Sequence, residues 1–140
     1  MFRRIIRRTG KEEGGQSLVE FAFVLPIFLL VLFAIVDFGM AFNAWLTVTN
    51  SAREGARLGT IHAPAVDIEQ RVRNTASSLD QADLTVTVTN ADGDPGTSVV
   101  VDVSYTYSVM TPVAGLVSMV SGGTVSDTFT ISSTADMRLE

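Results

Sequence analysis

Three patterns in the sequence predict an α+β fold: a long N-terminal transmembrane helix that extends into a small head, with a second helix and a three- to four-stranded antiparallel sheet. Residues 21–36 carry no charged side chain, small residues recur every three or four positions as far as Gly59, and residues after Leu84 alternate between apolar and polar. The first pattern is typical of a membrane span, the second of a closely packed helix and the third of half-buried strands.

The first fifteen residues form a basic segment, which we expect to be a cytoplasmic leader. Residues 1–15 hold five basic and two acidic side chains, a net charge of +3, whereas the remainder has a net charge of −8. A basic cluster immediately before an apolar span stays on the cytoplasmic side. We therefore expect a single-pass protein of the cytoplasmic membrane, with its N-terminus inside and its C-terminal head outside. A tail that stays attached is the alternative to a cleaved leader. A secretory signal peptide cut after Ala44 is disfavoured, because bulky Phe42 would stand three residues before the cleavage site.

Residues 16–59 are predicted to form one continuous helix, transmembrane at about 18–40, because an apolar run of about 20 residues spans a bilayer. Pro26 lies inside the span, where it is either simply tolerated or loosens the helix locally. Beyond the span, Arg53, Glu54 and Arg57 form a solvated face, or else the two arginines pair with acids elsewhere in this subunit or in a neighbour. Small residues form one stripe that another backbone could approach closely: Ala41, Ala44, Val48, Ala52, Gly55 and Gly59.

The head is predicted at residues 60–140. A second helix is expected over Val66–Leu79, with an apolar face that repeats at helical spacing. Strands are expected at Leu84–Asn90, at Val99–Val109 and from Val125 onward, because apolar and polar side chains alternate there. Residues 113–120 are apolar without a period, so a short helix and a strand both fit. The dry face of the sheet needs a cover, which the two helices can supply.

Glu20 interrupts the apolar run near its cytoplasmic edge, where a carboxylate is costly in hydrocarbon. If the chain is cut after Gly15, Gln16 becomes the first residue and Glu20 the fifth. The new amine and the carboxylate then lie about 6 Å apart along the helix axis. The amine of an adjacent subunit would offset the carboxylate. This arrangement predicts an ion pair between subunits that fixes the axial offset of helices packed side by side.

A basic leader, a glycine, an acid five positions later and an apolar helix together resemble the signal of prepilins. Residues 15–59 are similar to the TadE-like family of pilin-related proteins from tight-adherence (Flp) pilus systems. The last six residues, Ala135–Glu140, also look like the ending of that family. The resemblance rests on Gly15, Val19, Glu20, Phe21, Leu25, Pro26, Asp37, Phe38, Gly39 and residues 50–59, which include Ala52, Arg53, Glu54, Gly55, Ala56, Arg57 and Gly59.

The resemblance implies a pilin-like fold and a minor pilin or pseudopilin that takes part in pilus assembly and cell adhesion. Carried over by position, Gly15 is the scissile residue for a prepilin peptidase, and Glu20 is the assembly acid. Gln16 is bulkier than the small residue often found at its position in pilins. The implied partners are the lipid bilayer, other pilin subunits through the N-terminal helix, the peptidase and the pilus assembly platform. After assembly, the protein would lie in an extracellular pilus.

Composition argues against an enzyme, a cofactor, a nucleic acid or a small-molecule substrate. The chain has no cysteine and a single histidine, His62, and it shows no phosphate loop, zinc signature or basic patch suited to nucleic acid. Residues 90–94 alternate as in a calcium loop, but Val101 stands where that loop needs a glutamate. A permanently anchored extracytoplasmic ligand-binding or sensor module is the alternative function. An anchored hydrolase is a weaker third, because few catalytic groups are present.

Overall fold

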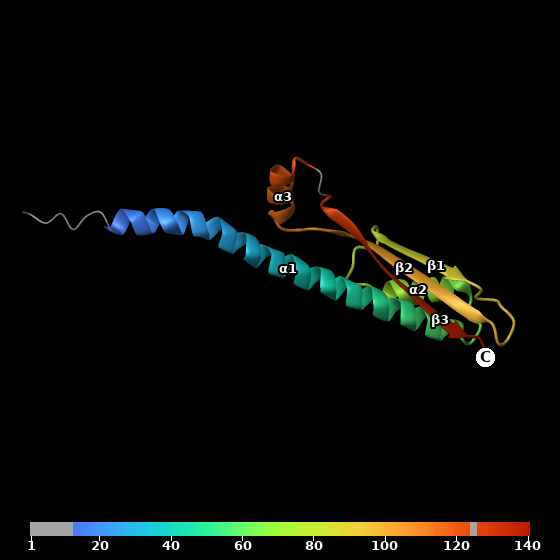
Figure 1. The fold of residues 1–140 in the computed structure, drawn as a ribbon. Helices are drawn as coiled ribbons and strands as arrows, with labels where there is room; N and C mark the ends of the chain where they lie inside the picture. The colour runs from blue at the N-terminus through green and yellow to red at the C-terminus, as the bar shows by residue number, and fades with distance from the viewer. Residues whose placement is uncertain (1–12, 124–125) are drawn as a thin grey trace, which may run out of the picture.

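The computed structural model describes residues 13–123 and 126–140, and Figure 1 shows its fold. The elements follow in the order α1 (Glu13–Gly59), α2 (Ala65–Thr75), β1 (Leu84–Thr89), β2 (Ser98–Ser108), α3 (Val113–Ser121) and β3 (Thr128–Arg138). The strands form one three-stranded antiparallel sheet in the order β1-β2-β3. The predicted α+β class, with a long N-terminal apolar helix, a further helix and an antiparallel sheet, is confirmed.

Helix α1 is one continuous helix that projects far beyond the head (Figure 1). It begins at Glu13, a turn earlier than predicted, and it runs through Pro26 without a break in the helical assignment. The basic cluster of the predicted leader lies outside the described residues. Between residues 15 and 36 every side chain is exposed or half-exposed, whereas from Ala44 onward one stripe is buried. The same helix thus serves two environments.

The head has two layers, with the two helices covering one face of the sheet. The distal half of α1 packs against β2 and β3, and α2 packs against α1 and β1. The apolar residues between the helices and the sheet are removed from water. This burial of apolar surface is the main favourable contribution to folding. The core comprises Ala44, Val48, Ala52, Ala56, Ile68, Val72, Ala76, Leu84, Ala91, Val99, Val101, Val103, Tyr107, Ile131, Ala135 and Leu139.

The strand register follows the alternation in the sequence. Val101, in the central strand, lies opposite Val88 of β1 and Ala135 of β3, and these residues belong to the same inward row. Asp102, one position further, is exposed on the other face. Successive side chains of a strand point to opposite faces, so the register places the apolar row against the helices and leaves the polar row in water.

One predicted helix ends earlier in the structure than the sequence suggested, and one segment that the sequence left open proves to be a helix. Helix α2 ends at Thr75 rather than Leu79, and the Gln81 side chain donates hydrogen bonds to the carbonyl groups of Ala76 and Leu79 just beyond the helix end. These bonds satisfy carbonyl groups that lack a helical partner. Residues 113–120, which fitted a helix or a strand, lie in helix α3, Val113–Ser121. It ends at Gly122, whose φ of 70° is the left-handed conformation that favours glycine after a helix.

The last residues of the described chain join the sheet to the end of α1. Leu139 is buried, and its N–H donates to the carbonyl group of Thr97 at 2.8 Å. The N–H of Glu140 donates to the carbonyl group of Thr60 at 3.1 Å. The distal end of α1 is therefore held from both sides, by the sheet and by the final turn of the chain.

Candidate functional site

The predicted cleavage and assembly residues lie together on the first turns of α1. The amide Nε2 of Gln16 donates to Oε1 of Glu20 at 3.3 Å, and both side chains are exposed. Residues four apart share a helix face, which is why this bond can form. A Cβ added to Gly15 would have no neighbouring heavy atom within 4 Å. Among the described residues, no other side chain therefore covers the Cα of Gly15, which lies within helix α1.

The apolar half of α1 offers side chains to its surroundings along its whole length. Phe21 is 59% exposed, and Pro26 is exposed as well. The segment is long and apolar enough to cross a membrane, and its most apolar stretch is not buried within the described protein. In a soluble helix of this length the apolar side chains would be covered by other elements. This half of α1 is therefore suited to lipid or to other helices.

Asp37 ties α1 to the segment that precedes α3. Its side chain is only 8% exposed. Its Oδ1 accepts the backbone N–H of Met110 at 3.2 Å, and its Oδ2 accepts the hydroxyl of Thr111. The hydroxyl of Tyr107 donates to the backbone carbonyl of Asp37 at 3.3 Å. Burial, with smaller contributions from Asp37 and Tyr105, raises the pKa of Tyr107 above its ordinary value. We call Asp37 with Tyr107, Met110 and Thr111 the Asp37 latch.

The distal motif of α1 divides into buried and exposed positions. Arg53 is exposed, whereas the small residues lie against the sheet and α2. A Cβ on Gly55 would lie 2.5 Å from Cγ2 of Val72, and one on Gly59 would lie 2.8 Å from Cγ1 of Val99. Contacts that short do not occur, so these two positions require glycine for the close approach of the helix. The buried small residues of the motif are Ala52, Gly55, Ala56 and Gly59.

Glu54 connects the motif to α2. Its carboxylate accepts from Nε of Arg57 at 3.0 Å and from Nε of Arg71 at 3.1 Å. The hydrogen bonds from Arg57 and then Arg71 lower the pKa of Glu54 to about 2, and the same pairing raises the pKa of Arg57. Arg53 and Arg57 both lie on the exposed face, and Arg57 pairs with Glu54 of the same face rather than with an acid elsewhere in the described residues. Arg71 joins the pair from α2.

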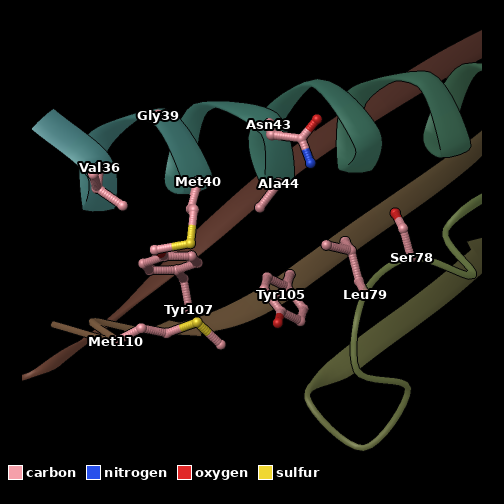
Figure 2. Close-up of a pocket in the computed structure, with 10 residues that line it drawn as sticks. All are labelled: Val36, Gly39, Met40, Asn43, Ala44, Ser78, Leu79, Tyr105, Tyr107 and Met110. Atoms are coloured by element: carbon pink, nitrogen blue, oxygen red, sulfur yellow. The ribbon is translucent and has the colours of Figure 1, made fainter.

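A groove opens beside Gly39, between α1 and the sheet (Figure 2). Its volume is about 460 Å³. Met40 points from α1 toward the ring of Tyr107 (Figure 2). Tyr105, Leu79 and Met110 line the groove on the side opposite α1. Gly39 itself has nothing within 4 Å of a Cβ position, in contrast to Gly55. The small size of residue 39 is therefore not used by packing within this chain.

The described residues contain no group of three or more His, Cys, Asp or Glu side chains that could hold a metal ion. Residues 90–94, the weak calcium candidate of the sequence, form a turn in which Nδ2 of Asn90 donates to Oγ1 of Thr97 at 3.0 Å and to the carbonyl group of Ser98 at 2.8 Å. The side chain of Asn90 is thus engaged in holding the turn.

The comparison with known families falls on the same part of the chain as these sites. Residues 15–57 match the TadE-like protein family. The match starts at Gly15 and includes Glu20, Asp37 and the distal motif as far as Arg57. It agrees with the resemblance found in the sequence, and it covers α1 and not the sheet. We call residues 15–57 the TadE-like segment. No curated protein and no solved structure gave a match.

Sequence reasoning placed Asp37 in the TadE-like segment but missed what it holds. Its partners are Tyr107, Met110 and Thr111, which are at least 70 positions away along the chain. A buried carboxylate needs hydrogen-bond donors, and this requirement is the signal that a search for partners could have used. No local pattern indicates which distant segment supplies them. The TadE-like segment thus contains the exposed apolar half of α1, Asp37 of the latch and most of the buried stripe that packs against the head.

Proposed function

We propose that this protein is a minor pilin or pseudopilin of a tight-adherence pilus system, without enzymatic activity, that is processed after Gly15 by a prepilin peptidase. The match of the TadE-like segment carries the proposal, because this family suggests a role in tight-adherence pilus systems. The continuous α1 supports it, since one helix combines an exposed apolar half with a half that carries a folded head. In the anchored form the head lies outside the cytoplasmic membrane.

The arrangement of Gln16 and Glu20 supports a role for both residues in assembly. Their side chains lie on one face of α1 and are hydrogen-bonded in the uncut chain. Cleavage after Gly15 would create an ammonium group on the face that carries the carboxylate. In lipid a lone carboxylate is expensive, and an ammonium group from a neighbouring subunit would offset much of that cost. Such a pair would fix the axial stagger between adjacent helices.

Other subunits would contact the apolar half of α1, because the most apolar stretch of this helix is not buried within the described protein. Side chains such as Phe23 and Ile27, which are 75% and 67% exposed, supply the surface. Helices in lipid associate through packing rather than through the hydrophobic effect, and small residues help their backbones approach.

The test is the N-terminus of the mature protein, measured by mass spectrometry of the membrane fraction from cells that carry the tight-adherence system. We expect a chain that begins at Gln16. Gly15→Leu should leave the chain uncut, whereas the matched variant Gly14→Leu should shift cleavage far less. A wild-type chain that keeps its leader while still entering pili would overturn the processing step.

Assembly is measured separately, as the share of protein in the sheared pilus fraction. Glu20→Gln removes the charge with little change of shape and should strongly reduce that share while cleavage continues. Leu18→Ile, a nearby control that keeps the apolar surface and lies outside the residues that carry the resemblance, should leave it nearly unchanged. Normal incorporation of the Glu20→Gln variant would contradict the pairing of carboxylate and amine.

The alternative is a permanently anchored ligand-binding or sensor module, and the groove of Figure 2 is the observation that favours it. Apolar pockets with a few polar groups are the usual ligand sites of proteins. In that case the chain would stay uncut, monomeric and confined to the membrane. The alternative explains neither the Gly15 and Glu20 spacing nor the match of the TadE-like segment, so we favour the pilin role.

A further inference from the structure

The connection between β2 and β3 is much longer than a hairpin requires. Antiparallel neighbours can be joined by about two to five residues, yet here residues 109–127 intervene and include α3. The N–H of Val109 donates to the carbonyl group of Asp127 at 2.8 Å, so the base of the connection is closed. We call the described part of this excursion, residues 109–123, the α3 arm.

The α3 arm differs from the rest of the head in its charge. The sequence between Asp102 and Asp127 contains no charged residue, whereas charged side chains recur throughout the remainder of the head. Several apolar side chains of the arm are exposed as well. Met110 is 78% exposed, Met119 is 83% exposed and Val117 is 37% exposed. A surface that faced only water would be expected to carry charges among such residues.

The arm lies beside the outer end of the membrane span. Val113, the first residue of α3, borders a small cavity with Ala34, Phe38 and Ala41 of α1, and α1 and α3 contact each other. The hydrogen bonds from Met110 and Thr111 to Asp37 hold the start of the arm beside Asp37 of α1. Figure 1 shows α3 set apart from the sheet, alongside α1, at the end of the head from which the free half of α1 projects.

The level of the membrane surface follows from α1 itself. A span that begins near residue 18 needs about 20 residues to cross the hydrocarbon core, which places its outer boundary close to Phe38. Phe38, Phe42 and Trp45 form a row of aromatic rings at that height, with centroid distances of 6.5 and 5.5 Å. Aromatic side chains are enriched at the boundary between lipid and water. The α3 arm begins at the height of this boundary.

We propose that the α3 arm is a second membrane contact, which inserts into the outer-leaflet interface of the phospholipid bilayer beside the span. The occupant of its exposed apolar face is lipid, because the arm is continuous with the membrane surface set by α1 and lacks the charges of the rest of the head. Since it has no basic residue, its insertion depends on burial of apolar side chains and not on anionic headgroups. The contact holds the head at a fixed tilt and height on the bilayer. It concerns the anchored form and is independent of cleavage and pilus assembly.

The chain lacks cysteine, so single-cysteine variants of the full protein report position cleanly. Met119→Cys and Met110→Cys carry a nitroxide label in the arm, Phe28→Cys in the span is the lipid reference, and Thr87→Cys on the wet face of β1 is the aqueous reference. The proteins are reconstituted in phosphatidylcholine vesicles, with and without phosphatidylglycerol. Collisions of each label with oxygen and with a water-soluble nickel complex are compared.

We expect the oxygen-to-nickel ratio at residues 110 and 119 to be several-fold above that at residue 87, and equal in the two lipid mixtures. In the protein labelled at residue 110, the additional substitution Met119→Asp should lower the oxygen-to-nickel ratio toward the value measured at residue 87. Aqueous values at residue 119, while the Phe28 label remains in lipid, would overturn the proposal. Spin–spin broadening that rises with the protein-to-lipid ratio would overturn it in favour of a second copy of the chain.

Discussion

The two halves of α1 have similar residues but opposite surroundings. Gly39 in the membrane half has nothing within 4 Å of a Cβ position, whereas Gly55 in the distal half would bring a Cβ within 2.5 Å of Val72. Ile35 is 64% exposed, yet Val48, little more than three turns later, is fully buried. Glycine and apolar residues therefore do not by themselves indicate packing within one chain. In the distal half the partner is the head, and in the membrane half it is whatever surrounds the protein.

The largest effect is expected when the same substitution is made in both halves. Gly55→Leu would force side-chain atoms into Val72 and Val101, and overpacking of this kind costs about 3 kcal/mol of the free energy of unfolding. Gly39→Leu is the matched control and should leave the head as stable as wild type, since its surroundings are open. Thermal unfolding of the full protein in detergent, followed by near-UV circular dichroism, measures both. Equal destabilisation by the two variants would remove the contrast between the halves.

A smaller effect is expected at the junction between the halves. Asp37→Ala would leave the N–H of Met110 and the hydroxyl of Thr111 without their acceptor, a loss of about 2 kcal/mol in local stability. Hydrogen exchange of the Met110 amide should accelerate, while amides in β1 stay protected. Asp102→Ala, on the exposed face of β2, serves as the control. If the Met110 amide exchanged at the same rate in the Asp37→Ala protein, the latch would not hold the arm.

The smallest effect concerns the charged link between the distal half and α2. The pKa of Glu54 is lowered from 4.5 to about 2 by its hydrogen bonds to Arg57 and Arg71. A carboxyl group whose pKa is lower in the folded state stabilises the fold above its unfolded pKa and loses that contribution as the pH falls through the folded pKa. Stability should therefore decline modestly between pH 4.5 and 2.

Acid unfolding of the wild type and Glu54→Gln measures this contribution. The variant should show a flatter dependence of stability on pH in that window, and the difference should shrink in high salt because both arginine partners of Glu54 are exposed. Glu69→Gln, which removes a pair within α2 alone, is the control. A pH dependence unchanged in Glu54→Gln would show that other carboxylates determine the acid transition.

Local patterns in the sequence were enough to predict most elements of this fold. The alternation in β2 placed Val99, Val101 and Val103 on the inward face, where all three are buried. The stripe ending at Gly55 and Gly59 predicted a close approach, and both glycines lie against valine side chains. Such patterns work because residues on one face of a helix or strand meet the same environment.

Contacts between distant segments could not be predicted in the same way. The state of residues 113–121 remained open, because a short apolar run fits a helix or a strand equally well until its surroundings are known. The Asp37 latch and the pairing of Arg71 with Glu54 depend on how the chain folds back, which no local spacing encodes. The roles of Gly15 and Glu20 concern processing and other subunits, so they stay predictions.

The capture of α1 at Gly59 has a mechanical consequence. The end of the helix lies against Val99, and the final turn of the chain bonds to Thr60 just beyond it. A force applied to the apolar half of α1 along the helix axis would therefore act as shear on the interface between helix and sheet. Many contacts of that interface would bear the force at the same time. A head attached in this way should resist being drawn along the helix axis far better than being peeled from its side.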